Sequence, residues 1–440
     1  MTDRTSDFDI AIIGSGMIGS CLALGLSELS RDAWRIALID PYQDDLQQST
    51  GFDARAIALS YGSTRILDGL NLWQAMSKSS TAISQIEVSD RGHSGITRLN
   101  AEKEGVPFLG KVIELYAAGN CLHKAIKEQP GIEPVKESLS DIAMTENGAL
   151  LKVGERELTA KLVLACDGAN SKTRELIELE LKRRSYEQMA FVSTVSTQLP
   201  HEHRAFERFT EHGPLALLPL SDDRLSLVWT LPPELAKAYA DKEQFSDEQL
   251  LEQLQKDFGM RLGRFTRIGQ RAVFPLALTE SEALSKGPVL MLGNAAQSLH
   301  PIAGQGFNLG LRDVATLLDV LCEAALDDEG YSQEEKCKPL SELDIEGLLT
   351  QYAELRASDR GRVMLLTDAL ARLFANPSPI ISLPRNLVLH ALNLAPEGKR
   401  VLARQAMGLA GWQPRLVRGL SLTTRAPHAR EPNSREAAHG

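Results

Sequence analysis

Two glycine-rich segments of the chain have the residue types and spacing that bind a phosphate or another hydrogen-bond acceptor. The first is Gly14-Ser-Gly-Met-Ile-Gly19, and the second spans Gly304–Gly310. Because glycine has no Cβ, the backbone can approach a ligand closely and its N–H groups stay free to donate. The two segments lie far apart in the sequence, so we expect them to hold the two ends of one long ligand.

The first segment has the spacing Gly14-x-Gly16-x-x-Gly19, with a strand pattern before it and a helix pattern after it. Asp40 follows the next predicted strand. This order is typical of a dinucleotide site, where a pyrophosphate meets the helix N-terminus and a carboxylate holds ribose hydroxyls. The Asp40 carboxylate could instead cap a loop. The motif does not distinguish FAD from NAD.

Two further polar motifs have more than one interpretation. Arg55 lies within Asp53-Ala-Arg55-Ala-Ile-Ala-Leu-Ser60 and could bind a phosphate with two parallel hydrogen bonds or pair with a surface carboxylate. Asp167-Gly168 follows a predicted strand, where it could contact a ligand or form a plain turn. The residues alone leave both questions open.

The second segment follows an apolar strand that ends at Gly293. Asn294 and Asn308 flank its loop, and an amide side chain can both donate and accept hydrogen bonds. The glycines at 304–310 start an apolar-periodic helix beside the strand, which predicts a second anion- or dipole-binding helix start. His300 could carry a proton, or a backbone group could satisfy its ring.

Composition narrows the class of protein. The 440 residues are 43% hydrophobic and 24% charged, as expected for a globular protein of two or three domains. Five scattered cysteines without a CxxC pair favour a reducing compartment and argue against disulfides and zinc. The chain leaves no room for a signal peptide and has no apolar stretch of about 18 residues, which predicts a cytoplasmic protein. Neither a metal nor a nucleic-acid partner is predicted.

Charge is unevenly distributed along the chain. Residues 360–440 carry a net charge of +8, whereas the rest carries −18. A basic C-terminal region, including Arg415 and Arg418, could bind anionic lipid or an acidic partner. The same residues could equally form a solvated helical face.

The elements that would position the glycine segments begin with a parallel α/β unit: a strand over 9–13, a helix over 18–29 and a strand over 34–39. Residues 149–153 and 157–165 are predicted to form a hairpin. Its second strand would deliver the Asp167-Gly168 motif at its end.

The pattern changes after this unit. Several strands without intervening helices are predicted between 190 and 232, which indicates an antiparallel sheet. Residues 234–258 and most of the chain from 344 onward have helix patterns. The predicted fold class is α/β, with a Rossmann-like domain, an inserted antiparallel-sheet domain and a helical C-terminal region. The predicted boundaries are 1–75, 100–183 and 280–335 for the dinucleotide-binding domain, 76–99 and 184–279 for the inserted substrate domain, 340–425 for the helical region, and 426–440 for a disordered tail.

Together these motifs resemble the aromatic-ring hydroxylases, single-component flavoprotein monooxygenases that use FAD and a reduced nicotinamide. The resemblance runs from about Phe8 to Leu420 and rests on three motifs in the family's order. Within that group the chain is similar to the ubiquinone-biosynthesis hydroxylases, through residues 53–60 and 300–308. Most relatives have Gly-Asp-Ala-Ala-His where this chain has Gly293-Asn-Ala-Ala-Gln297.

The resemblance implies roles for the residues at the phosphate end of an FAD site. Gly14, Gly16 and Gly19 would hold the pyrophosphate, Asp40 the adenosine ribose, and Arg55 would lie near the phosphates.

It also implies roles at the flavin-ring end. The Asp167-Gly168 motif would lie near the pyrophosphate and the approach of the nicotinamide. Asn294 would bond the ribitol, and Gly304, Gly306 and Asn308 would line the isoalloxazine ring. Asn294 is a departure, since its amide keeps the hydrogen bonds of the usual Asp but lacks the negative charge.

The implied reaction uses NADPH or NADH and O2 to hydroxylate an electron-rich phenol that carries a polyprenyl tail. The cofactor would carry the chemistry, and no residue is predicted as a catalytic acid or base. The basic C-terminal region could then face the membrane or an assembly of quinone-biosynthesis enzymes. A nicotinamide dehydrogenase and a disulfide reductase fit the motifs less well. A prenyl reductase of the same fold and a non-catalytic flavin-bound subunit stay open.

Overall fold

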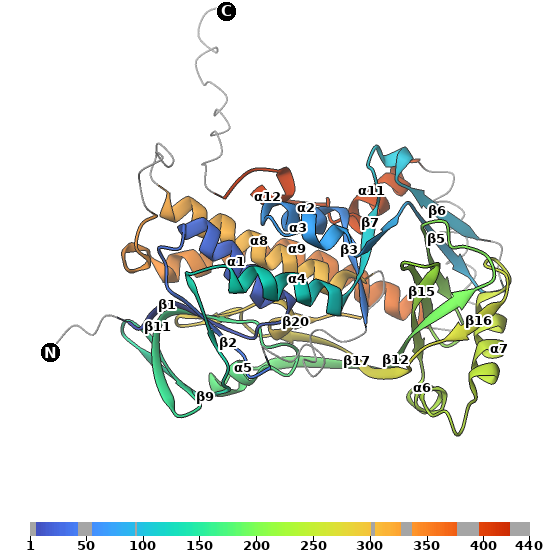
Figure 1. Ribbon diagram of the computed structural model, residues 1–440, viewed down its shortest axis with the longest axis horizontal. Helices are drawn as coiled ribbons and strands as arrows, with labels where there is room; N and C mark the ends of the chain where they lie inside the picture. Colours follow the sequence, from blue (N-terminus) through green and yellow to red (C-terminus); the bar gives the residue numbers. More distant parts are fainter. Residues whose placement is uncertain are drawn as a thin grey trace, which may run out of the picture.

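The computed structural model describes residues 6–42, 55–92, 95–300, 304–326, 337–375 and 396–422. It confirms the predicted fold class. A mostly parallel sheet with helices forms one side of the molecule and a mostly antiparallel sheet the other (Figure 1). The long strands β12 (Leu181–Thr197) and β17 (Ala272–Ser281) run between the two sides along one edge of this view.

The first sheet has five parallel strands in the order β19-β11-β1-β2-β8, which is the arrangement of a Rossmann-like domain. At its β19 edge, β18 pairs antiparallel. Strands β10 and β11 form the predicted hairpin, and β9 adds a further antiparallel strand beside β10. The strands are β1 (Phe8–Ile13), β2 (Ile36–Ile39), β8 (Ile132–Val135), β9 (Leu139–Thr145), β10 (Gly148–Val153), β11 (Arg156–Ala165), β18 (Ser285–Lys286) and β19 (Val289–Met291).

Helices bury the central strands of this sheet, which explains their continuous apolar sequence. Helix α1 packs against both α4 and α8, so that it is buried on almost every side. One hydrophobic core joins the strands to these helices. The helices are α1 (Met17–Ser30), α4 (Leu115–Lys127), α5 (Lys172–Leu176) and α8 (Gln305–Ala325).

The second sheet has the order β20-β17-β12-β15-β14-β13-β5-β6, and β16 pairs with β12. Its neighbours are antiparallel except β13 and β5, which are parallel. Helices α6 (Pro233–Ala240) and α7 (Asp247–Phe258) cover one face. The further strands are β5 (Gln85–Asp90), β6 (Ile96–Asn100), β13 (Arg204–Phe209), β14 (Pro214–Pro219), β15 (Arg224–Leu231), β16 (Phe265–Ile268) and β20 (Gln297–Ser298).

A small third sheet packs against the other face of the second sheet. Its order is β3-β7-β4, and a cluster containing Val112 of β7 and Ala205 of β13 joins the two sheets. Its elements and the helices that follow them are β3 (Ala56–Ser60), β4 (Ser80–Ile83), β7 (Gly110–Glu114), α2 (Tyr61–Gly69) and α3 (Trp73–Ser77).

The C-terminal helices share the core of the first domain. Helix α9 (Ile345–Ala375) packs along α8, and α12 (Arg415–Arg418) packs on α2 and α8. Tyr352 and Leu416 are members of the main hydrophobic core. Helix α11 (Pro396–Ala406), by contrast, belongs to a smaller cluster in which Ala403 packs with Leu99 and Leu109. Residues 426–440 fall outside the described part. No helix in the described ranges is long and apolar enough to cross a bilayer.

Candidate cofactor site

The three predicted motifs lie at the ends of three adjacent parallel strands. Gly14 follows β1, Asp167 follows β11 and Gly293 follows β19. In an open parallel sheet, ligands bind beyond the carboxyl ends of the strands. The fold therefore brings together motifs that are far apart in the sequence.

Two glycines of the first loop are required by the protein's own packing. Gly14 has φ +99°, and a Cβ there would lie 2.7 Å from the carbonyl oxygen of Cys166. A Cβ at Gly19 would overlap the carbonyl oxygen of Gly14. These glycines let the turn after β1 lie directly against the end of β11.

Three other predicted glycines border open space. Among the described residues, no heavy atom lies within 4 Å of the Cβ position at Gly16, Gly168 or Gly306, apart from the glycine's chain neighbours and its own helix backbone. Gly16 is the N-cap of α1, where no side chain caps the helix and no acidic residue lies in the first turn. The positive helix end is thus available to an anion, as a bound pyrophosphate requires.

Asp40 contacts the first loop directly. One carboxylate oxygen accepts the N–H of Ser15 at 2.7 Å, and the other accepts the N–H of Tyr42 at 2.8 Å. Asp40 therefore caps the loop, one of its two predicted roles. Each carboxylate oxygen can accept a further hydrogen bond, so ribose binding is compatible with this geometry.

Asp167 provides an unused acceptor at the end of β11. Its Oδ2 accepts hydrogen bonds from the N–H and the hydroxyl of Thr173, each at 2.9 Å. Its Oδ1 is buried and has no partner within the described residues. A buried acceptor without a partner is costly, and a donor from a bound ligand would satisfy it.

The two glycine segments meet at Ile18, in the first turn of α1. A Cβ at Gly310 would lie 2.8 Å from Ile18 Cδ1, and a Cβ at Gly293 would lie 3.3 Å from Ile18 Cγ1. The start of α1 therefore packs directly against the Gly293 turn and the start of α8. This contact supports the prediction that both segments hold one ligand.

Asn308 holds the second segment in place. Its Oδ1 accepts hydrogen bonds from Ser60 N at 2.8 Å and Ser63 Oγ at 2.7 Å. Its Nδ2 donates to the carbonyl oxygens of Ala58 and Gly304, at 2.9 and 2.6 Å. Protein groups therefore use all four hydrogen-bonding positions of this buried amide, which no sequence motif indicates. Its direct effect is to hold Gly304 against β3.

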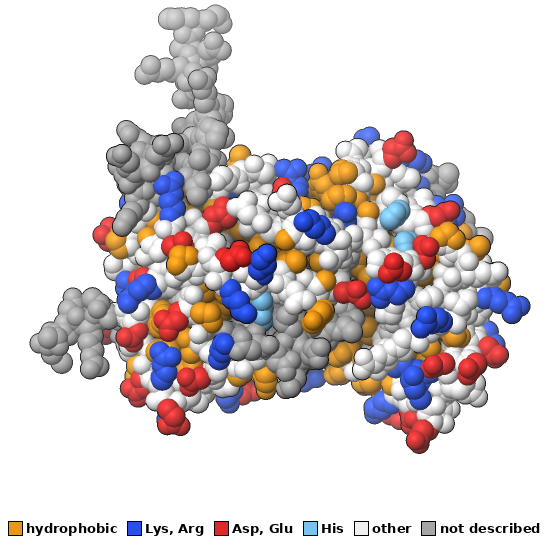
Figure 2. Space-filling view, viewed as in Figure 1, with side chains coloured by type: hydrophobic (Ala, Val, Ile, Leu, Met, Phe, Trp, Pro, Cys, Tyr) orange, Lys and Arg blue, Asp and Glu red, His pale blue; other side chains and the backbone are white. Residues whose placement is uncertain are grey.

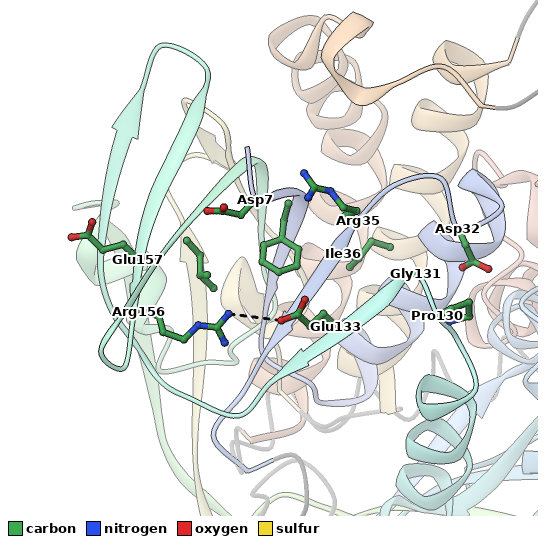
Figure 3. A pocket seen from close by; sticks show the side chains of 11 residues that line it. Asp7, Asp32, Arg35, Ile36, Pro130, Gly131, Glu133, Arg156 and Glu157 are labelled. Atoms are coloured by element: carbon green, nitrogen blue, oxygen red, sulfur yellow. Dashed lines mark ion pairs between the residues drawn. The ribbon is translucent and has the colours of Figure 1, made fainter. Parts of the chain in front are cut away.

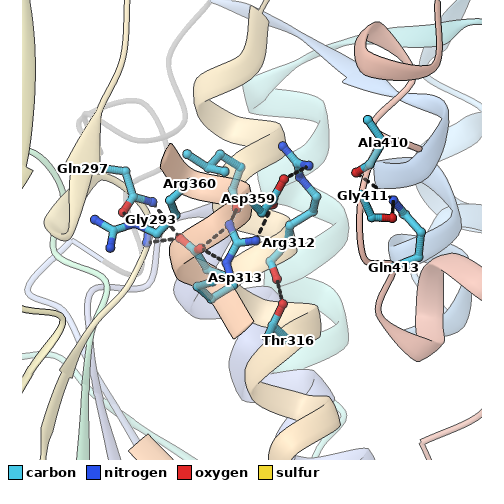
Figure 4. Close-up of polar contacts among 12 residues, drawn as sticks. Gly293, Gln297, Arg312, Asp313, Thr316, Asp359, Arg360, Ala410, Gly411 and Gln413 are labelled. Carbon is cyan, nitrogen blue, oxygen red and sulfur yellow. Dashed lines mark hydrogen bonds and ion pairs between the residues drawn. The ribbon is translucent and has the colours of Figure 1, made fainter. Parts of the chain in front are cut away.

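Asn294 lies in the short turn Gly293–Ala295, and Gln297 begins β20 just after it, but the two side chains have different surroundings. Asn294 is exposed. Gln297 is 3% exposed; its Nε2 donates to Asp313 Oδ2 at 2.9 Å and its Oε1 accepts from Arg360 Nε at 2.7 Å (Figure 4). The same Asp313 oxygen accepts the N–H of Gly293 at 3.0 Å.

A buried ion-pair network supports this turn from α8 and α9. Arg356 donates through Nε to Asp313 Oδ1 at 2.8 Å and also contacts Asp359. Arg312 donates to Asp359 Oδ1 at 2.8 Å (Figure 4). Arg360 also pairs with Glu280 at 3.9 Å, so three arginines face three carboxylates and the charges of this network balance.

Arg55 lies toward the second sheet. Its guanidinium stands 4.7 Å from the ring centroid of Phe274 in β17, a cation–π arrangement. Arg55 therefore lies where the first domain meets the second sheet. Asp53, which begins the same motif, falls outside the described residues.

His300 is fully buried, and its ring packs edge-on against Tyr186 with 5.0 Å between the centroids. Burial lowers the pKa of His300 to about 4. The ring is therefore neutral at physiological pH, which disfavours the proton-carrier interpretation.

Arg415 corrects one expectation for the basic C-terminal region. It is 2% exposed, its backbone N–H donates to Asp319 Oδ2 at 2.9 Å, and its guanidinium donates to the carbonyl oxygen of Ser421. Arg415 therefore cannot face a membrane, because its side chain holds α12 in place. Arg418 is exposed.

A cavity of about 890 Å³ lies at the opposite end of the parallel sheet. Its lining includes Phe8, Ile36 and Glu133, at or near the starts of β1, β2 and β8, and the ion pair Arg156–Glu133 (Figure 3). The first glycine loop follows the other end of β1. This cavity is therefore separate from the candidate cofactor site.

Comparison with known proteins identifies the family of the chain. The family model described as an FAD binding domain matches residues 7–330. Ubiquinone hydroxylase UbiL of Rhodospirillum rubrum is 32% identical, over 94% of this chain and 93% of the relative. The 3-demethoxyubiquinol 3-hydroxylase of Escherichia coli is 30% identical, over 93% of this chain and 100% of the relative.

Solved structures show the same fold. The p-nitrophenol 4-monooxygenase PnpA from Pseudomonas putida DLL-E4 has a TM-score of 0.73 and 16% identity, covering 92% of this chain and 98% of that one. PqsL of Pseudomonas aeruginosa has a TM-score of 0.67 and 21% identity, covering 84% and 97%. The matched family model and the full-length relatives show that the chain belongs to the ubiquinone-biosynthesis family of FAD-dependent aromatic hydroxylases.

Proposed function

We propose that the chain hydroxylates the aromatic ring of a polyprenylated phenol, with FAD as cofactor, NADPH or NADH as reductant and O2 as co-substrate. The observation that carries the proposal is the meeting of the two glycine segments at Ile18. The contact supports the proposal because the start of α1, where we propose that the pyrophosphate binds, lies beside the Gly293 turn, and one cofactor could therefore reach both segments. Two relatives are named hydroxylases of ubiquinone or a ubiquinol.

At the phosphate end, Gly14 and Gly19 would shape the loop and Gly16 would leave space for the pyrophosphate. Asp40 would hold the loop and the adenosine ribose together. Arg55, above Phe274, would add positive charge where the two sheets meet.

At the ring end, Asp167 would offer its free oxygen and Gly168 would leave room for the nicotinamide. Asn294 would bond the ribitol, while Gly306 would border the isoalloxazine ring. Asn308 would act indirectly, by holding Gly304 in place. When bound and reduced, the flavin supplies the activation of O2, and the protein supplies orientation and exclusion of water.

We propose 2-octaprenyl-6-methoxyphenol as the substrate. The support is the resemblance of the segment from Gly293 to Pro301 to the hydroxylase of that compound. The Escherichia coli relative is named for another substrate, 3-demethoxyubiquinol, so the ring position is assigned by a direct test.

The test combines purification with metabolite profiling. The proposal expects a yellow protein whose oxidation of NADH or NADPH is stimulated by a polyprenylphenol, with a product that is heavier by one oxygen atom. Cells that lack the chain should accumulate 2-octaprenyl-6-methoxyphenol, and another accumulated phenol would assign another hydroxylation step. Saturation of the prenyl tail would identify a reductase. A flavin-bound protein without turnover would identify an assembly subunit.

We also propose peripheral contact with an anionic membrane surface through α11 and the segment before α12. Val401 is 69% exposed and Trp412 is 45% exposed. Arg400, Arg404 and Arg418 are exposed in the same region of sequence. Apolar and basic side chains together are typical of interfacial binding. Figure 2 shows hydrophobic side chains gathered beside the place where Figure 1 labels α11.

A further inference from the structure

The two faces of the second sheet differ in how they are covered. The face toward α6 and α7 is packed, with Phe191, Leu227 and Trp229 each fully buried. On the opposite face, one row of register partners crosses six strands, and each member is partly exposed. The row consists of Val88, Glu207, Ala216, Val228, Val192 and Ala272. Register partners point to the same side of a sheet, so these six side chains form one strip, called here the Glu207 row.

The Glu207 row lies on the side of the sheet that faces the candidate cofactor site. Phe274, two residues beyond Ala272 and on the same face, lies under the guanidinium of Arg55. Ala205, two residues before Glu207, belongs to the cluster that includes Ala58 of β3.

Ala58 connects this face to the second glycine segment. Its Cβ lies 3.3 Å from the Cβ position at Gly304, and its carbonyl oxygen accepts a hydrogen bond from Asn308. The predicted flavin-ring end of the site therefore borders the sheet face that carries the Glu207 row.

Glu207 is the single ionisable member of the row, and its neighbours in the row are apolar. Its carboxylate forms no hydrogen bond or ion pair with another residue in the described ranges. Burial raises the pKa of Glu207 to about 7.

Other charged groups on this face are already engaged. Asp90, two residues past Val88 on β5, already has an interaction partner. Arg224 pairs with Glu114 at 3.3 Å. Arg55 stands over Phe274. Glu207 is therefore the carboxylate of the row whose hydrogen-bonding capacity is available to a ligand.

We infer that Glu207 binds the ring hydroxyl of the phenol substrate and accepts its proton, while the apolar members of the Glu207 row contact the ring. An apolar surface with one placed polar group is the usual make-up of a small-molecule site. This assignment rests on the proposed function. Glu207 would be a catalytic base, a role for which the sequence motifs indicate no residue.

The chemical step is a simple proton transfer. The phenol O–H bond breaks, its electron pair stays on the oxygen, and the proton forms an O–H bond with the Glu207 carboxylate. The phenolate directs electron density into the ring carbons beside and opposite the oxygen, which favours attack by an electrophilic oxygen atom. The carboxylic acid can return the proton afterwards, so no other reactant is needed.

The test compares E207Q and E207L with the native holoenzyme, using 2-geranylphenol as the probe. Glutamine keeps the shape and a hydrogen bond but cannot accept the proton. We expect E207Q to bind the probe with a Kd within about threefold of native, measured by the flavin difference spectrum. Its maximal rate should fall by roughly 10²–10⁴-fold, the usual contribution of a general base. The rise of the native rate with pH near 7 should disappear. E207L should weaken probe binding about tenfold or more, which a role only in folding would not predict.

E211Q is the matched control, because Glu211 lies on the adjoining turn with a side chain 63% exposed. Its rate, pH profile and Kd should equal those of the native protein. Native activity and pH dependence in E207Q would overturn the assignment and leave the proposed function intact. Absence of probe-stimulated NAD(P)H oxidation in the native holoenzyme would instead reject the proposed function, and the Glu207 assignment with it. Thermal melting of each variant identifies any loss of fold.

Discussion

Asp313 of α8 and Arg356 of α9 form an ion pair in the protein interior, with 2.7 Å between Asp313 Oδ1 and Arg356 Nη2. Both side chains are 2% exposed or less. The second oxygen of Asp313 holds the N–H of Gly293. Helix α9 is therefore connected, through the Asp313 carboxylate, to the turn that is predicted to meet the flavin.

Replacement of Arg356 should destabilise the protein. In R356M the Asp313 carboxylate stays buried without its main partner, which typically costs about 3–5 kcal/mol. Urea unfolding of the apoprotein measures the change. The exposed Arg362 on the same helix gives the control R362M, which should unfold like the native protein. Equal midpoints for R356M and R362M would contradict the importance of the pair.

Gly16 and Gly19 should respond differently to a larger side chain. Gly16 has φ −61° and borders open space, so G16V should leave the melting temperature of the apoprotein unchanged. A valine there would fill the space proposed for the pyrophosphate, and FAD affinity should fall about tenfold or more, equivalent to about 1.4 kcal/mol. G19V should lower the melting temperature instead, because its Cβ overlaps Gly14. Flavin fluorescence titration and thermal melting separate the two effects, and unchanged FAD affinity in G16V would exclude Gly16 from the site.

Restoring a carboxylate at position 294 should change the redox behaviour of the flavin. Asn294 is exposed, so N294D should not alter apoprotein stability. A negative charge near the flavin disfavours the electron-rich reduced form, and the midpoint potential should therefore fall. Spectroelectrochemical titration measures it, with N294S as the uncharged control. Equal flavin midpoint potentials in N294D and N294S would show that residue 294 lies away from the flavin.

His300 should make stability depend on acid pH. Its pKa of about 4 in the folded state lies below the ordinary value of 6.5, because burial disfavours the charged ring. Between these values the unfolded chain binds the proton and the folded protein does not, so the free energy of unfolding rises with pH from about 4 to 6.5. The full effect is about 3 kcal/mol.

The test of His300 is a difference measurement, because other groups also titrate. Urea unfolding at several pH values gives the difference in free energy of unfolding between the native protein and H300N. This difference should change between about pH 4 and 6.5 and stay constant above pH 7. A difference that is constant from pH 4 to 8 would contradict a neutral His300.

Membrane contact through α11 should depend on exposed residues and not on Arg415. The triple variant R400A/R404A/R418A should float less with vesicles of phosphatidylglycerol than the native protein does, and added salt should reduce native flotation. R415A should lower the melting temperature because its guanidinium anchors the chain near Ser421. Native flotation by the triple variant would reject the α11 surface. K237A, at an exposed lysine of α6, is the surface control.

Much of the fold followed from local patterns. The strand over 9–13, the helix over 18–29 and the hairpin at 149–165 correspond to β1, α1 and β10–β11, because apolar runs and glycine turns are local signals. The predicted helix over 234–258 is two helices. Ser246 begins the second helix with a capping box, and Asp241 ends the first in extended backbone.

Long-range contacts could not be predicted in the same way. The parallel pairing of β5 with β13 joins strands separated by more than a hundred residues, and no local pattern encodes it. Arg415 was predicted as part of a basic surface, because composition does not show which carboxylate or carbonyl group an arginine will meet. Asn308 was predicted as a ligand residue, but three of its four protein hydrogen bonds depend on β3 and α2, which lie about 250 positions earlier.

The contact of Ile18 with Gly293 and Gly310 also limits how this protein can be recombined. Helix α1 and the start of α8 come from opposite ends of the FAD-binding sequence, yet the residues at positions 18 and 310 cannot change size independently. A chimera that takes residues 1–75 from a relative with a bulkier residue at position 18 would push α1 away from Gly310. Residues 18, 293 and 310 should therefore be exchanged as one unit, and crossover points between them should give poorly folded progeny.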